Sequence, residues 1–91
     1  MNDARIDAIR DRLIRHFAPT ELEVRDDSAL HAGHAGARDG RGHYAVRIVA
    51  AAFAAHGRVE RHRMVYAALG ELMQTEIHAL SIIAVSPDES H

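Results

Sequence analysis

The sequence predicts one α+β domain in which helices pack on one face of a three-stranded mixed sheet. Three observations support this fold class. Apolar residues first repeat at helical spacing, then alternate with polar residues in two short segments, and finally form a strand-length run after a second helical region. A strand that follows a helix can join a sheet as a parallel neighbour through a right-handed crossover. The predicted order is therefore helix, strand, strand, short helix, helix and strand.

The first helix is predicted to begin near residue 2 or 3. Its apolar stripe, spaced by three or four residues, comprises Ile6, Ile9, Leu13 and Phe17. Acidic residues lie early in this segment and basic residues late, which is the order that the helix dipole favours. Pro19 ends the helix because proline cannot continue the backbone hydrogen bonding.

Two strands, expected to be antiparallel neighbours, follow this helix. From Glu21 onward, Leu22 and Val24 alternate with charged residues, and the same alternation returns over residues 44–49. The connection between the strands, residues 28–42, holds four glycines and few large apolar groups. Loops of this length are uncommon in small domains and often functional, so we expect a mobile functional loop.

The C-terminal half should contain a short helix, a longer helix and the last strand. Phe53 is expected to anchor the short helix, and Gly57 breaks it before the longer one begins. The inward stripe of the longer helix is predicted to comprise Val65, Ala68, Leu69 and Leu72. The final apolar run, residues 79–85, carries apolar groups on both faces, so we expect it to be the more covered strand.

The composition narrows the function classes. Without cysteine, the chain alone forms no disulfide, thiolate zinc site or self-contained iron–sulfur site. Eleven basic residues, all arginine, against thirteen acidic ones give a net charge of -2, which disfavours a surface built mainly to neutralise phosphates. No nucleophile elbow or catalytic triad is evident, so we expect no enzyme activity. No apolar run approaches the length of a membrane span, and we expect a cytoplasmic protein without membrane contact.

Three histidines are candidate metal ligands. His31 and His34 lie three residues apart in the predicted loop, where both imidazoles could reach one zinc, copper, iron or nickel ion. The alternative is a polar loop with no ligand. His78 lies just before the final strand, where it either binds a metal or caps the helix–strand junction.

A basic segment opens the longer helix, with Arg58, Arg61, His62 and Arg63 within six residues. One interpretation is a docking patch for phosphate, nucleic acid or an acidic protein surface. The other is local structure, in which His62 is partly buried and Arg61 pairs with an acidic group. The residues alone leave both interpretations open.

Four separated strings together resemble the BolA family from about Ile6 to Pro87: DDSALHAGHAGA, HYAVRIVAAAF, VERHRMVYAALGEL and IHALSI. The resemblance implies an αββααβ, class II KH-like fold. This order agrees with the one predicted from periodicity. The chain departs from the family at one turn, where related chains often have Phe-x-Gly, because Phe53 is followed here by Ala54 and Ala55.

The resemblance also implies a partner and a cofactor. BolA-like proteins pair with monothiol glutaredoxins of the CGFS type and share a bridging [2Fe-2S] cluster, to which glutaredoxin and glutathione supply thiolates. The positions that match the family's histidine ligands are His78 and His31, with His34 as the alternative loop ligand. The implied role is iron–sulfur trafficking or iron and redox signalling.

An alternative role implied by the same resemblance is a DNA-binding transcriptional regulator of stress response and cell morphology, acting through the helix that carries Arg61, His62 and Arg63. We expect one domain over residues 1–91, with its core at about 3–87 and an acidic tail at 87–91. The free protein is expected to be a monomer or a weak homodimer.

Overall fold

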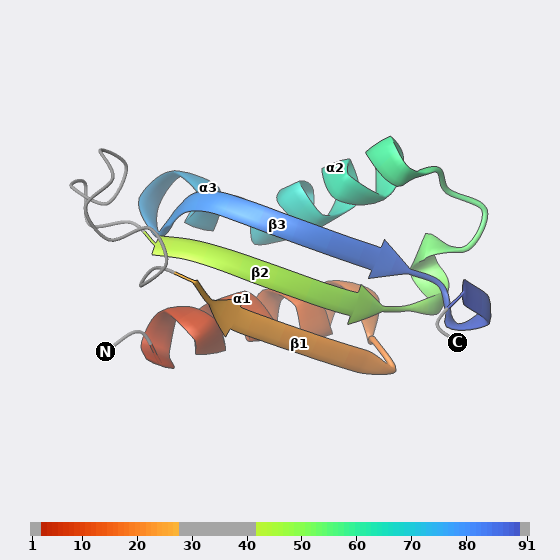
Figure 1. The fold of residues 1–91 in the computed structure, drawn as a ribbon, viewed down its shortest axis with the longest axis horizontal. Coiled ribbons are helices and arrows are strands. Elements are labelled where there is room, and N and C mark those ends of the chain that lie inside the picture. Colours follow the sequence, from red (N-terminus) through yellow and green to blue (C-terminus); the bar gives the residue numbers. More distant parts are fainter. Residues whose placement is uncertain (1–2, 28–41, 90–91) are drawn as a thin grey trace.

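The computed structural model describes residues 3–27 and 42–89 of the chain (Figure 1). The predicted loop ligands His31 and His34 lie outside the described residues. The helices and strands are α1 (Asp3–Phe17), β1 (Glu21–Asp26), β2 (Gly42–Val49), η3 (Ala51–Phe53), α2 (Arg58–Leu69), α3 (Leu72–Thr75), β3 (Ile77–Val85) and η4 (Pro87–Glu89).

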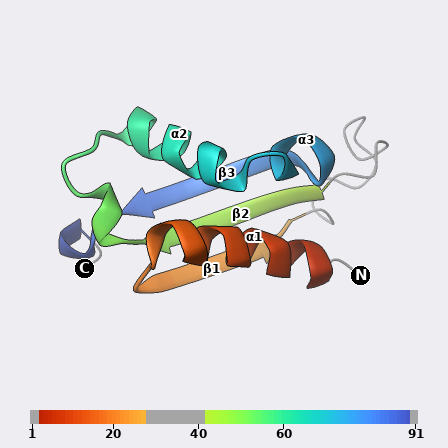
Figure 2. The same cartoon turned by 180° about the vertical axis from the view of Figure 1, so that it is seen from behind.

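The three strands form one mixed sheet in the order β1-β2-β3. β1 is antiparallel to β2, with Val24 opposite Val46, and β3 is parallel to β2, with Ile82 opposite Val46. Both long helices pack on one face of the sheet, which Figure 2 shows from the helical side. The α+β fold class, the αββααβ order and the mixed sheet are therefore confirmed.

The core lies between the helices and the covered face of the sheet. The predicted stripe of α1 is confirmed, because Ile9 and Leu13 are fully buried. The short helix η3 is anchored as expected by Phe53, whose ring lies 4.9 Å from that of Phe17 between centroids. The cluster is completed by Ala50 and by residues of β2, α2 and β3: Tyr44, Val46, Ile48, Val65, Ala68, Leu69, Ile77 and Ile82.

Two expectations about the C-terminal half are wrong in detail. The longer helix ends at Leu69, because Gly70 has a φ of 55°, and Leu72 starts the separate helix α3, where it is only partly buried. β3 is an edge strand and not the more covered one, and Ile83 on its open face is 58% exposed. The covered strand is the central β2. Apolar residues on both faces of a strand do not reveal its place in the sheet.

Candidate functional site

His78 lies at the start of β3, where the pairing with β2 is irregular. Gly42 pairs with Ile77 and His43 with Ala79, so His78 is the extra residue of a bulge. A bulge re-aims the side chain it carries. Ile77 is fully buried while the His78 side chain is exposed. The predicted ligand therefore projects an accessible imidazole from an anchored strand end.

A second histidine lies beside His78 and was missed by the sequence analysis. The ring centroids of His43 and His78 are 5.1 Å apart, with the ring planes tilted by 54°. His43 is 9% exposed, so its ring is almost fully buried. Extending the predicted alternation of residues 44–49 by one residue towards the N-terminus would have placed His43 on a sheet face. The contact itself depends on the register of a parallel pair, which local sequence does not encode.

The chain segments that carry these two histidines are tied together. The backbone N–H of Gly42 donates to the carbonyl oxygen of Glu76 over 3.0 Å, and Nε of Arg5 donates to the Glu76 carboxylate over 2.8 Å. Burial raises the pKa of the neighbouring Tyr44 hydroxyl, while Arg5 partly offsets this shift. These contacts tie the start of β2 to the residue that precedes β3, next to His43 and His78.

Within residues 3–27 and 42–89, no group of three or more histidine and acidic side chains is arranged to hold a metal ion. The imidazoles that lie together there are those of His43 and His78. Two neutral imidazoles are suitable ligands for iron, zinc, copper or nickel. The described part of the chain therefore offers half of a four-coordinate ligand set, which a partner or solvent would have to complete.

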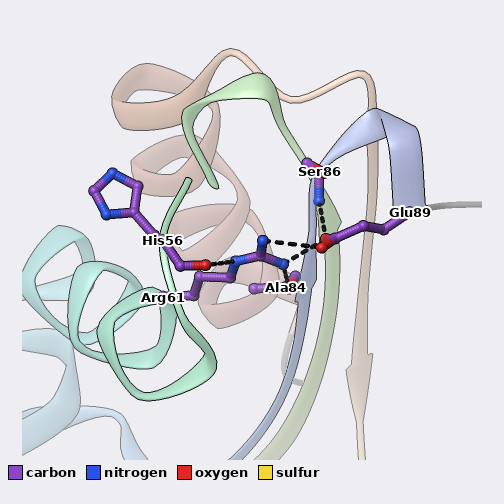
Figure 3. Close-up of polar contacts among 5 residues, drawn as sticks. All are labelled: His56, Arg61, Ala84, Ser86 and Glu89. Atoms are coloured by element: carbon purple, nitrogen blue, oxygen red, sulfur yellow. Dashed lines mark hydrogen bonds and ion pairs between the residues drawn. The ribbon is translucent and has the colours of Figure 1, made fainter. Parts of the chain in front are cut away.

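Arg61, one of the candidate docking residues, makes several contacts within the protein (Figure 3). Its Nε donates to the carbonyl oxygen of His56 over 2.8 Å and Nη1 to that of Ala84 over 3.1 Å. The same guanidinium forms a two-point ion pair with Glu89, and its side chain is only 12% exposed. Arg61 thus joins α2, β3 and η4, which confirms the local interpretation for this residue.

Glu89 completes this arrangement from the C-terminal side. Its carboxylate accepts hydrogen bonds from Arg61 and from the backbone N–H of Ser86, over 2.8 Å for the latter. These contacts lower the pKa of Glu89 to about 2. The helix η4 is therefore attached to the rest of the fold through Glu89.

The other basic residues of the segment differ in exposure. Arg58 and Arg63 are exposed, and His62 is partly buried, as the local interpretation expects. Arg58 and His62 line a groove of about 570 Å³ between the start of α2 and the end of β3, which Arg61 and Glu89 also line. His56 lines the same groove, and its Nδ1 contacts the carboxylate of Glu60. The segment divides into one structural arginine and two accessible ones.

Comparison with known proteins places this geometry in context. The family model described as BolA-like protein matches residues 13–89. The chain is 44% identical over 86 residues to SufE-like protein 1, chloroplastic/mitochondrial, of Arabidopsis thaliana, covering 89% of this chain and 23% of that protein. It is 42% identical over 89 residues to Protein BOLA1, chloroplastic, of the same plant, covering 94% and 56%.

A bacterial relative and a solved structure extend the comparison. The DNA-binding transcriptional regulator BolA of Escherichia coli (strain K12) is 36% identical over 74 residues, covering 81% of this chain and 68% of the relative. The solved BolA domain of SufE1 from Arabidopsis thaliana superposes with a TM-score of 0.84 at 41% identity, covering 94% and 95%. The fold is thus shared over 94% of this chain.

The comparisons also bear on location. The chain spans 23% and 56% of the two plant proteins, whose names place them in chloroplasts or in chloroplasts and mitochondria. In the part of the chain that the structure describes, no helix has the length and apolar character needed to cross a membrane. The cytoplasmic location stays a prediction.

Proposed function

Because the chain belongs to the BolA-like protein family, we propose that it is a non-enzymatic iron–sulfur partner that pairs with a CGFS monothiol glutaredoxin and shares a bridging [2Fe-2S] cluster. His78 and His31 would be its ligands, with His34 as the alternative to His31. The observation that supports this role best is the exposed imidazole of His78, projected by a bulge from the anchored start of β3.

The ligand chemistry is consistent with this role. The chain has no cysteine, so it contributes no thiolate and depends on a partner for half of the ligand set. Imidazole is a recognised replacement for thiolate on one iron of a [2Fe-2S] cluster, and it raises the reduction potential relative to an all-cysteine cluster. This chain's part is to present neutral ring nitrogens from a fixed strand end.

The test of this proposal is the visible spectrum of the protein mixed with a CGFS glutaredoxin, glutathione, iron and sulfide. We expect a heterodimer spectrum that differs from that of the glutaredoxin homodimer. His78→Ala should abolish this difference without unfolding the chain, because the His78 side chain is exposed and contributes little core volume. His16→Ala, which removes an exposed histidine from α1, is the matched control.

The loop ligand can be tested in the same assay. His31→Ala should weaken cluster sharing less than His78→Ala, since His34 lies three residues away and carries the same donor. The His31→Ala, His34→Ala double variant should then match His78→Ala. An unchanged heterodimer spectrum in His78→Ala would show that the ligand assignment is wrong.

A second candidate function is DNA binding. It is favoured by the name of the Escherichia coli relative and by Arg58 and Arg63, the two exposed arginines of the segment that opens α2. The net charge of -2 and the ion pair of Arg61 with Glu89 argue against this function.

A further inference from the structure

We propose that the free chain binds one divalent transition-metal ion of the zinc, nickel or copper class between His43 and His78, without glutaredoxin and without an iron–sulfur cluster. The inference shares His78 with the proposed function but does not depend on it. It rests on the contact between two imidazoles from neighbouring strands, which lies within the described residues.

The distance between the rings fits a shared ion. With a metal–nitrogen distance of about 2.0–2.1 Å, the centre of a bound imidazole ring lies about 3.2 Å from the metal. Two rings on one tetrahedral ion then have centroids about 5.2 Å apart, and at a right angle about 4.5 Å. The observed centroid separation of His43 and His78 is 5.1 Å. The centroid separation in the free chain therefore matches that of two imidazoles on one tetrahedral ion.

The two histidine side chains also differ in exposure, and this difference favours binding of a metal ion. His43 is 9% exposed and fixed in the central strand, so one ligand is in place before the ion arrives. His78 is exposed, so its ring can turn towards the shared ion without disturbing the core. Ile77, fully buried next to it, keeps the backbone of the bulge in position.

The donor set decides the class of ion. Two imidazoles suit zinc, copper and nickel, whereas magnesium and calcium require oxygen ligands. The described residues offer no third protein ligand arranged with this pair, so water or a small anion must fill the remaining positions. We therefore expect one ion per chain, bound reversibly and removable by a chelator.

The experiment is a zinc titration of the free chain. Calorimetry measures the affinity and the number of ions bound, and NMR monitors the signals of the histidine rings. Saturation at one ion per chain should move the ring signals of His43 and His78 first. His78→Ala should weaken zinc binding by about tenfold or more, since loss of a ligand costs at least as much as loss of a group that supports one. His43→Gln should do the same, with a dispersed spectrum showing that it is folded.

Controls separate this pair from the other six histidines of the chain. His16→Ala and His56→Ala should leave the affinity unchanged, and so should the His31→Ala, His34→Ala double variant. Unchanged affinity in His43→Gln or in His78→Ala would overturn the proposal, as would loss of binding in the double variant. Cluster sharing with glutaredoxin is measured separately, so either result can fail while the other holds.

Discussion

Ala55 has a backbone φ of 69°, in the left-handed region that favours glycine. It occupies the position at which BolA-like chains often have the glycine of a Phe-x-Gly turn, so the departure noted in the sequence leaves an alanine in a glycine conformation. The left-handed conformation costs an L-residue about 1–2 kcal/mol. The fold keeps the turn because Phe53, two residues earlier, is fully buried.

Ala55→Gly should therefore stabilise the protein. Relief of the backbone strain exceeds the extra freedom that glycine has in the unfolded chain, and we expect a net gain of up to about 1 kcal/mol in the free energy of unfolding. Urea unfolding followed by circular dichroism measures it. Ala54→Gly is the control, because Ala54 has a φ of -59° and should lose about 0.5–1 kcal/mol. Equal effects of the two variants would contradict the strain argument.

Gly42, the first residue of β2, is needed for close packing. A Cβ atom built there would lie 2.6 Å from the ring of Tyr44, which is 2% exposed and cannot move aside. Gly42→Ala should lower the free energy of unfolding by about 1–3 kcal/mol, the usual cost of overpacking. The added methyl group should shift the backbone at residue 42, whose N–H bonds to Glu76. The variant should therefore also disturb the ring contact of the neighbouring His43 with His78.

The comparison variant for this prediction is Gly57→Ala. No atom lies within 4 Å of a Cβ built at Gly57, which precedes α2, so its cost should stay below about 1 kcal/mol. Thermal unfolding gives the stabilities, and NMR of the histidine rings gives the local effect. A stable Gly42→Ala variant with unchanged ring signals would show that the strand ends are looser than the contacts indicate.

At the scale of the elements, the attachment of η4 to α2 predicts a pH dependence. The pKa of Glu89 is lowered from 4.5 to about 2 by Arg61 and the Ser86 N–H. A lowered pKa in the folded state means that the ionised form stabilises the fold above pH 4.5, and that this contribution is lost as the pH falls towards 2. Arg61 stays charged throughout.

The measurement is the difference in free energy of unfolding between the natural chain and Glu89→Gln as a function of pH. It should be constant above pH 4.5 and shrink towards zero near pH 2. Taking the difference cancels the titration of the other carboxylates. Glu71→Gln is the control, since Glu71 makes only a 3.5 Å contact with Arg12 and is 76% exposed. A pH-independent difference for Glu89→Gln would refute the assignment.

The elements also show what local sequence could and could not predict. The stripe of α1 and the alternation of β1 and of residues 44–48 in β2 were readable because one face of each is more buried than the other, which leaves a periodic pattern. The end of α2 at Gly70 was missed, since Leu72 continues the apolar spacing although the backbone has already turned. The edge position of β3 and the meeting of His43 with His78 depend on strand order and register, which arise only when distant segments pack.

For the whole molecule, the candidate site was predicted in part. His78 was identified from its position and from the family resemblance, but its neighbour His43 was not. Arg61 was given two interpretations, and only Glu89, 28 residues further on, decides between them. Long-range ion pairs leave no local pattern in the sequence. The ion pair of Arg61 with Glu89 also bears on DNA binding, because one of the three arginines of the basic segment is no longer available to contact phosphate.

Because Arg61 is paired with Glu89, the exposed arginines of the segment are Arg58 and Arg63. Each phosphate contact contributes about -0.9 to the slope of log affinity against log salt, so two contacts give a slope of about -2. On a chain of net charge -2 we expect weak DNA binding without sequence preference at about 0.15 M salt, and a much tighter glutaredoxin complex.

Fluorescence anisotropy with duplex DNA over a range of salt concentrations tests this expectation, with the Arg58→Ala, Arg63→Ala double variant. The double variant should flatten the salt dependence while leaving stability intact, because both side chains are exposed. Arg61→Ala is the contrasting variant, and it should lower stability because Arg61 joins α2, β3 and η4. Tight binding to one specific duplex at about 0.15 M salt, lost in the double variant, would make the regulator the primary function, because two phosphate contacts alone cannot supply such specificity.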